Sequence, residues 1–244
     1  MGTTNAQSGT RIDEVVAGIY RINTPIEGPT MPGGFSFNQY LVVDDEPFLM
    51  HTGPRRMFAL VREAIETVMP VAKLRWIGVS HYEADECGSL NEFLAVAPNA
   101  RSVSGAVAAM VSLSDVADRE PHALPDEGEL VLGNKRLMWL DTPHVPHAWD
   151  CGFFFEKETR TLLCGDLFTQ PGAKTPALTE GDVLGPSEAF RHAFDYYSHT
   201  KLAKRHIERL AKLAPTTLAC MHGSAWRGDG ASLLRELGVA LDKD

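Results

Sequence analysis

Short runs of apolar or alternating residues, separated by turn residues, predict β-strands near the start of the chain. Such runs lie at 15–22, 35–43 and 47–51, with a Pro-Gly-Gly turn and an acidic turn between them. Because they follow one another so closely, they predict a β-meander. The next segment, 54–68, has apolar residues at steps of three and four, which is typical of an amphipathic helix.

The rest of the chain changes repeatedly between short apolar runs and longer helical patterns. Strands are predicted at 76–79, 101–104, 130–132, 136–140, 152–156, 161–164 and 218–221. Helices are predicted at 89–97, 105–113, 187–214 and 231–241, and long loops at 115–129 and 170–186. Strands and helices in this order, with no repeat, predict an α+β domain whose mixed sheets pack between helices.

No segment has the composition of a linker, so residues 11–244 are expected to form a single domain. Residues 1–10 are small and polar; they are expected to be a flexible tail and lack the apolar stretch of a secretory signal. Apolar residues make up 44% and charged residues 23% of the chain, which suits a soluble domain with a sizeable core. No run reaches the roughly 18 apolar residues of a membrane span, which excludes an integral membrane protein.

The formal net charge of −9 argues against a general nucleic-acid binder, because neutralising phosphates requires an excess of Lys and Arg. The four cysteines, Cys87, Cys151, Cys164 and Cys220, form no C-x-x-C pair. This spacing excludes a zinc-ribbon type of cysteine cage and favours free thiols in a reducing compartment. We therefore expect a cytoplasmic protein.

The most informative segment is the loop that follows the apolar strand predicted at 76–79. Here His81, Glu83 and Asp85 occur at every second position, in front of a predicted helix. Loops at the carboxyl ends of strands are where ligands bind in α/β sheets. Three potential ligands this close together could serve two neighbouring metals, with His81 and Glu83 on one and Asp85 on the other.

Other predicted strands also end in residues that can bind a metal. These residues are His144, His147, Asp166 and His222, each a few positions beyond a predicted strand. Any one of them alone would more often be a surface residue or a residue of the core. Several strand-end loops that all deliver a His or a carboxylate favour a metal centre instead.

The order of these residues resembles the diiron domain of flavodiiron proteins and oxygen-binding diiron proteins, in the metallo-β-lactamase superfamily. The likeness extends over about residues 12–227. The stretches that carry it are FNQYLV at 37–42, His81-x-Glu83-x-Asp85, His144-x-x-His147-x-x-Asp150, Gly165-Asp166, Tyr196-Tyr197 and His222-Gly223-x-x-Trp226-Arg227. The resemblance implies an αββα sandwich, two mixed β-sheets between helices, with the metals at one edge of the sheets.

The resemblance also implies how the ligands divide between two iron ions. The first iron would be bound by His81, Glu83, His147 and Asp166. The second iron would be bound by Asp85, by His222 and by Asp166, which would bridge the pair. The set would combine three imidazoles with three carboxylates.

Five further residues are candidates to bind or support the metals. Glu86 stands where the family pattern usually has His; it could bind the second metal, hold a ligand imidazole, or complement the N-terminus of the following helix. His51 stands where the superfamily usually has Asp, and it is expected to have a structural or supporting role. His144 matches a family histidine that is not the usual ligand. A tyrosine beside the metals is expected in the family, and Tyr196 or Tyr197 would supply it.

The chemistry of this ligand set is informative about the metal. Hydrolytic zinc members of the superfamily usually have His where Glu83 stands. A hard carboxylate oxygen at that position favours iron or manganese, although raw affinity also allows zinc. A bridging oxo or hydroxo group would bring two Fe(II) ions and three carboxylates close to neutral charge. Open positions on both metals could hold a diatomic molecule such as O2 or NO.

These features favour a redox-active diiron protein that binds O2 or NO and either reduces or senses it, with an oxidoreductase preferred. Flavodiiron proteins carry a flavodoxin domain, whereas this sequence lacks a Gly-rich phosphate loop, so no flavin is expected within the chain. Electrons would come from a separate flavodoxin-like or rubredoxin-like protein. The alternatives are a dinuclear zinc hydrolase of an ester, lactone or thioester and, less favoured, a diiron oxygenase.

Two features concern protein partners. In the helix predicted at 187–214, Lys201, Lys204, Arg205 and Lys212 fall at near-helical spacing. They form either a solvated surface or a contact for an acidic electron donor. Because two-fold symmetric dimers are the commonest assemblies of soluble proteins, we also expect a homodimer.

Overall fold

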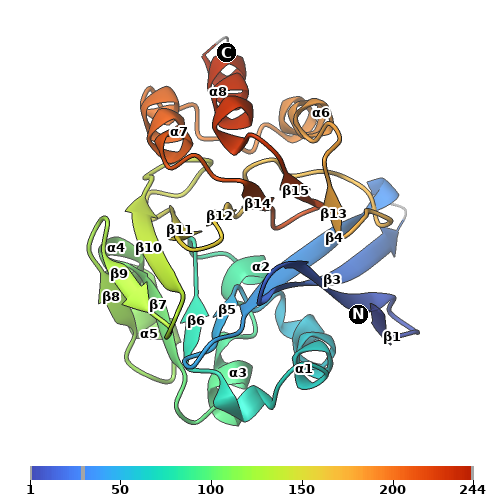
Figure 1. Ribbon diagram of the computed structural model, residues 1–244, viewed down its shortest axis with the longest axis vertical. Helices are drawn as coiled ribbons and strands as arrows, with labels where there is room; N and C mark the ends of the chain where they lie inside the picture. Colours follow the sequence, from blue (N-terminus) through green and yellow to red (C-terminus); the bar gives the residue numbers. More distant parts are fainter. Residues whose placement is uncertain (1, 29–30, 243–244) are drawn as a thin grey trace.

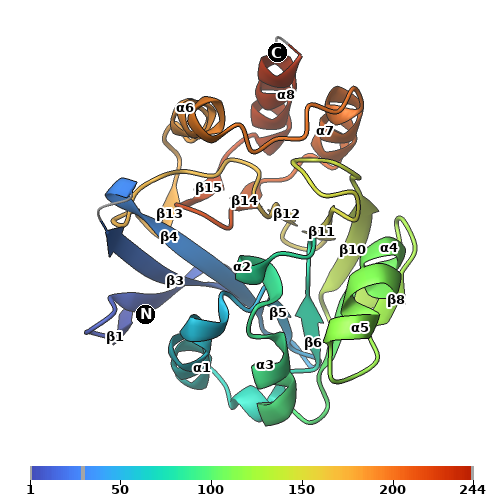
Figure 2. The ribbon, with the colours of Figure 1, turned by 180° about the vertical axis from the view of Figure 1, so that it is seen from behind.

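The computed structural model describes residues 2–28 and 31–242 and shows two β-sheets between two groups of helices (Figure 1). Helices α6 (Leu184–Phe194), α7 (Ala203–Lys212) and α8 (Gly230–Leu241) lie together at one end of the molecule. Helices α1 (Phe58–Glu66) and α3 (Leu90–Val96) lie at the opposite end, as the view from behind also shows (Figure 2). The arrangement is the predicted αββα sandwich of the metallo-β-lactamase type.

The first sheet is built by the N-terminal half of the chain. Its strands, in sequence and in space, are β1 (Gly2–Asn5), β2 (Thr10–Val16), β3 (Ile19–Gly28), β4 (Met31–Val42), β5 (Phe48–Met50), β6 (Trp76–Gly78), β7 (Arg101–Gly105) and β8 (His122–Leu124). Pairing is antiparallel from β1 to β5 and parallel from β5 to β8. Parallel neighbours require crossover connections, which is why helices separate the later strands in the sequence.

The second sheet is built by the C-terminal half of the chain. Its strands are β9 (Glu129–Val131), β10 (Arg136–Asp141), β11 (Gly152–Glu156), β12 (Thr161–Leu163), β13 (Leu178–Thr179), β14 (Thr217–Ala219) and β15 (Ala225–Arg227). In space they follow the order β13-β15-β14-β12-β11-β10-β9. Because β12 and β14 are parallel neighbours, the loops that follow them leave the sheet at the same edge.

Apolar side chains form three layers. One cluster packs Leu41 of the first sheet against Phe93 of α3, and another packs Leu218 of the second sheet against Leu234 of α8. Between the two sheets, Trp139 belongs to a third buried cluster. The short helical segments are α2 (Ala84–Cys87), α4 (Ala106–Ala108), α5 (Ser114–Val116), two 3₁₀ turns (Arg55–Met57, Val71–Lys73) and a π-helical turn (Ala109–Leu113). Burial of both sheet faces explains why many strands are continuous apolar runs.

Several expectations about the elements are wrong. The loops expected at 115–129 and 170–186 contain strands β8 and β13, respectively. The expected flexible tail at 1–10 contains strand β1, which pairs with β2; Met1 lies outside the described residues. The strand expected at 15–22 is two strands, β2 and β3, because Gly18 turns the chain at a φ of +73°. The helix expected at 187–214 is two helices, because α6 ends at Asp195, whose left-handed conformation stops a helix.

The two sheets are joined by backbone hydrogen bonds at one edge. The amide of Gly152, at the start of β11, donates to the carbonyl of Ser80, just after β6, at 3.0 Å. The amide of Asn38 in β4 donates to the carbonyl of Met221, just after β14, at 2.8 Å. The strand-end loops of both sheets are therefore held against one another. In the described part of the chain, no helix has the length and apolar character needed to cross a membrane.

Candidate metal centre

His81 lies in the loop that follows β6, and its ring is fully buried. Its Nδ1 lies 2.9 Å from the hydroxyl oxygen of Ser80, which in turn lies 2.8 Å from Nε2 of His51. Burial lowers the pKa of His51 to about 3, so that ring is neutral and its Nε2 can accept a hydrogen bond from the Ser80 hydroxyl. When Nδ1 of His81 donates to Ser80 and Ser80 donates to His51, the lone pair on Nε2 of His81 is free for a metal.

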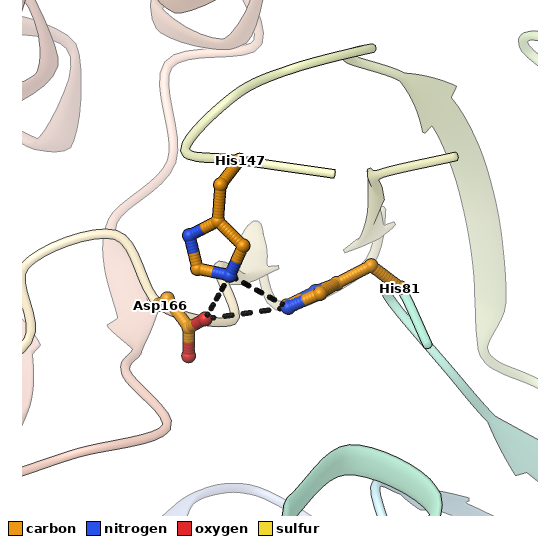
Figure 3. A group of neighbouring side chains, drawn as sticks. All are labelled: His81, His147 and Asp166. Atoms are coloured by element: carbon orange, nitrogen blue, oxygen red, sulfur yellow. Dashed lines mark hydrogen bonds and ion pairs between the residues drawn. The ribbon is translucent and has the colours of Figure 1, made fainter. Parts of the chain in front are cut away.

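His147 and Asp166 converge on this free nitrogen of His81 (Figure 3). The Nε2 atoms of His81 and His147 are 3.0 Å apart. Two nitrogens that bind one metal at about 2.1 Å and at right angles would be about 3 Å apart. Oδ2 of Asp166 lies 3.5 Å from Nε2 of His81 and 3.4 Å from Nε2 of His147. The three side chains therefore form a candidate metal-binding group.

The other oxygen of Asp166 faces a different histidine. Oδ1 of Asp166 lies 3.4 Å from Nε2 of His222, and Oδ2 of Asp85 lies 3.5 Å from the same nitrogen. Nδ1 of His222 donates to the carbonyl oxygen of Ser36 at 2.9 Å. Since a carbonyl can only accept, the proton is fixed on Nδ1 and the lone pair lies on Nε2. Asp166 thus lies between two groups of potential ligands.

Glu83 completes the six predicted ligands, and the charges of the cluster are coupled. Oε1 of Glu83 lies 3.1 Å from Nε2 of His147 and 3.8 Å from Nε2 of His81. The hydrogen bond with His147 lowers the pKa of Glu83, although partial burial opposes it. Burial lowers the pKa of His147 and of His222, but the neighbouring carboxylates outweigh it and raise both. Burial likewise opposes ionisation of Asp166, but the surrounding imidazoles hold its pKa below the usual range.

Glu86 also points into this cluster. Its side chain is fully buried, and Oε1 lies 3.8 Å from Nε2 of His81. With His81 and Glu83 it forms a second candidate metal-binding group. Neither of its carboxylate oxygens has a hydrogen-bond partner among the described residues. Burial, together with the charges of Asp166 and Asp85, raises the pKa of Glu86 well above its usual range.

Of the remaining candidates, Tyr196 contacts the site most directly. Its hydroxyl donates to the backbone oxygen of Asp166 at 3.2 Å, and its ring meets that of His147 edge-on, with centroids 6.0 Å apart. Tyr197 packs against Tyr196, with ring centroids 4.9 Å apart, and is buried. His144 is exposed, lies outside the candidate groups found among the described residues, and lines a separate surface cavity of about 250 Å³.

The cysteines are not part of the candidate groups. All four are free and buried. Cys87, which lies in α2, donates through its thiol to the carbonyl oxygen of Glu83 at 3.2 Å. Burial raises the pKa of Cys87 to about 12, which disfavours the thiolate form that binds metals.

Sequence reasoning missed the polar side chains that hold the His222 loop. The amide of Asn38 donates to the carbonyls of Cys220 and Gly223, both at 2.8 Å, and the hydroxyl of Tyr40 donates to that of Cys220 at 2.7 Å. Both side chains are buried. The signal that could have found them is the FNQYLV stretch, where polar residues interrupt an otherwise apolar strand.

The residues of the cluster fit a metal pair. Among the residues that the structure describes, the ion pairs of the buried carboxylates Glu86 and Asp166 are with histidines rather than with Lys or Arg. A buried carboxylate without a cation is costly, since it loses hydration without compensation. Three imidazole Nε2 atoms that can bind a metal once deprotonated, together with the carboxylates that face them, therefore suit two cations between them.

A known protein family matches the part of the chain that contains the candidate metal-binding residues. The family described as "ODP family beta lactamase" matches residues 35–223, a range that contains all six predicted ligands. An anaerobic nitric oxide reductase flavorubredoxin from Pectobacterium atrosepticum is 25% identical over 214 residues, covering 82% of this chain and 41% of that protein. A nitric oxide reductase from Moorella thermoacetica is 23% identical over 210 residues, covering 82% of this chain and 52% of that protein.

The chain thus spans about half or less of the length of these relatives. Among solved structures, the rubredoxin oxygen:oxidoreductase from Desulfovibrio gigas superimposes with a TM-score of 0.80 at 18% identity, covering 94% of this chain and 61% of that one. This likeness shows the shared fold. Because the family match covers most of the chain, the protein belongs to the ODP family of β-lactamases, the metallo-β-lactamase-like domains of flavodiiron type.

Proposed function

We propose that the chain holds two iron ions and binds O2 or NO at them. The ligands would be His81, Glu83, Asp85, His147, Asp166 and His222. The observation that carries the proposal is the position of Asp166, which offers one oxygen to His81 and His147 and the other to His222. A carboxylate placed in this way suits a bridge between two metals rather than a single site.

Iron is favoured over zinc by the donor set. Carboxylate oxygens are hard ligands, and Glu83 supplies one where the hydrolytic zinc members usually have an imidazole. An iron pair supplies reversible one-electron chemistry and open positions for a diatomic molecule. The names of similar proteins agree with this chemistry. Two relatives are named nitric oxide reductases, and a matched structure is named a rubredoxin oxygen:oxidoreductase.

The protein's own residues would orient the ligands and exclude water. The carbonyl of Ser36 fixes the tautomer of His222. The ring centroids of Phe35 and Phe37 lie 4.4 and 5.3 Å from that of His222, and the two rings form an apolar wall. On the other side, Tyr196 packs against the ring of His147. Apolar walls of this kind favour a small uncharged ligand over a charged one.

Turnover requires electrons. We propose that they come from a separate flavodoxin-like or rubredoxin-like protein, and that the chain is an oxidoreductase acting on O2 or NO or, without turnover, a sensor of these gases. The test is to purify the protein from iron-supplemented cells, measure metals per chain, reduce it anaerobically and add O2 or NO. We expect two irons per chain and new visible charge-transfer bands.

A pair of variants makes this test specific. Asp166→Asn should lose most of the bound metal, whereas Asp229→Asn, which alters the N-terminal cap of α8 on the surface, should retain wild-type metal content. Two zinc ions, no response to either gas, and turnover of an ester, lactone or thioester would contradict the proposal in favour of a hydrolase. Oxygen consumption that depends on an added organic substrate would instead indicate an oxygenase.

A further inference from the structure

Two glutamates are fully buried among the described residues, and they differ sharply in their surroundings. Glu156 accepts hydrogen bonds from the amides of Glu158 and Thr159, at 3.0 and 2.8 Å, and from the Thr159 hydroxyl at 2.5 Å. Glu86 has no hydrogen-bond partner at either oxygen. A buried carboxylate is expected to have hydrogen-bond donors or a cation at its oxygens. The described part of the protein supplies such donors to Glu156 but none to Glu86.

The position of Glu86 identifies what is missing. Its Oε1 lies 3.8 Å from Nε2 of His81, the same distance at which Oε1 of Glu83 lies from that nitrogen. Glu86 therefore faces the metal-binding nitrogen of His81 in the same way as a predicted ligand does. From this geometry, which rests on the proposed metal pair, we infer that Glu86 is a seventh ligand, binding through a carboxylate oxygen.

Other roles for Glu86 do not agree with the contacts. An acid that complements a helix N-terminus would accept backbone amides or face solvent, and Glu86 does neither. An acid that orients a ligand imidazole would contact the nitrogen remote from the metal. That nitrogen is hydrogen-bonded to Ser80 in His81 and to the carbonyl of Ser36 in His222. In His147 it has no hydrogen-bond partner among the described residues, so Glu86 does not hold that ring either, and Glu86 instead faces the opposite nitrogen of His81.

A seventh ligand changes the charge of the centre. Four carboxylates, from Glu83, Asp85, Glu86 and Asp166, balance the charge of two divalent ions without any further anion. A site with more negative charge stabilises the oxidised ions relative to the reduced ones. Glu86 is therefore expected to lower the reduction potential of the pair and to favour hard metals over zinc.

The test compares Glu86→Gln with the matched variant Glu156→Gln, using Fe(II) under anaerobic conditions and Zn(II) as probes. For Glu86→Gln, we expect the metal-free protein to melt at a higher temperature than the wild type, because an uncompensated buried carboxyl is removed. Its Fe(II) affinity should fall at least tenfold. Loss of a residue that only supports a ligand costs about 10–100-fold in metal affinity, so loss of a ligand should cost no less. Glu156→Gln should melt at a lower temperature and bind Fe(II) with wild-type affinity.

A third variant separates ligation from general disturbance of the loop. Glu86→His keeps a group that can bind a metal, so it should retain two metals per chain, with a lower ratio of iron to zinc and a higher reduction potential. If Glu86→Gln melts below the wild type and binds Fe(II) equally tightly, the inference is wrong while the proposed metal pair stands. If the wild type itself binds no metal, the proposed function fails first.

Discussion

The Nε2 atoms of His81 and His147 lie 3.0 Å apart, although 66 positions separate the two residues in the chain. Both nitrogens also face Oδ2 of Asp166. Two imidazole nitrogens this close cannot both carry protons without strong repulsion, and two bare lone pairs also repel. A cation between them would remove the conflict, and its binding would then be coupled to the protonation of the two rings.

We expect metal affinity to fall steeply once the pH drops below the raised pKa of His147 and of His222. The raised pKa of His147 and of His222 means that both rings keep their protons in the metal-free protein to a higher pH than an ordinary histidine. A metal must displace these protons, so two of them would weaken binding by up to about a hundredfold per pH unit. Competition titrations with Zn(II) at several pH values measure this, and an affinity that does not change with pH would contradict it.

His51→Leu should weaken metal binding without removing a ligand. The Ser80 hydroxyl that holds His81 loses its acceptor, and such supporting contacts are worth about 10–100-fold in metal affinity. His144→Leu is the matched control, because His144 is exposed and outside the cluster. Fe(II) titration of both variants provides the measurement; equal affinities would show that the hydrogen-bonded chain has no role.

His51 should also make the fold sensitive to acid. Its folded pKa of about 3 lies below the ordinary value of 6.5, so the stability it contributes is present above pH 6.5 and is lost as the pH falls toward 3. Melting temperatures of the metal-free proteins should therefore fall less over this range in His51→Gln than in the wild type. A parallel decline in the two proteins would argue that His51 becomes protonated without cost.

Glu83→His should lower the ratio of iron to zinc in the purified protein. The substitution replaces a hard oxygen next to His147 and His81 with an imidazole nitrogen, which suits zinc well. Glu180→His, an exposed change in the loop before α6, is the control. Metal analysis after growth with equal iron and zinc gives the ratio, and an unchanged ratio would remove the argument from ligand hardness.

Reversing charges on α7 and in the turn just before it should slow reduction by an acidic electron donor. Arg205 and Lys201 line a surface groove of about 580 Å³ between α7 and α8, while Lys204 is already paired with Asp242 at 2.5 Å. With Lys201→Glu and Arg205→Glu combined, we expect a lower rate of reduction by a flavodoxin and a weaker dependence on salt, because favourable steering is lost. Arg62→Glu on α1, at the opposite end of the molecule, should change neither quantity.

The positions of the candidate ligands along the chain were predictable, because each follows a predicted strand and such a pattern is local in the sequence. His81, Glu83 and Asp85 alternate directly after an apolar strand, and Asp166 and His222 each follow another strand, so the pattern indicated candidate ligands at strand ends. The αββα fold that gathers them was implied by the resemblance to flavodiiron proteins. The break after Phe194 was not predictable, since helical periodicity continues through it and only the left-handed Asp195 stops the helix.

Other features were decided by the tertiary structure alone. Sequence left three roles open for Glu86, and only the packing of the two sheets shows that its carboxylate is buried, unpartnered and directed at His81. The supporting contacts of Ser80 and Ser36 were equally invisible. The reason is physical: local patterns specify which way a side chain leaves its strand, but distances between groups remote in the chain are fixed only when the sheets pack together.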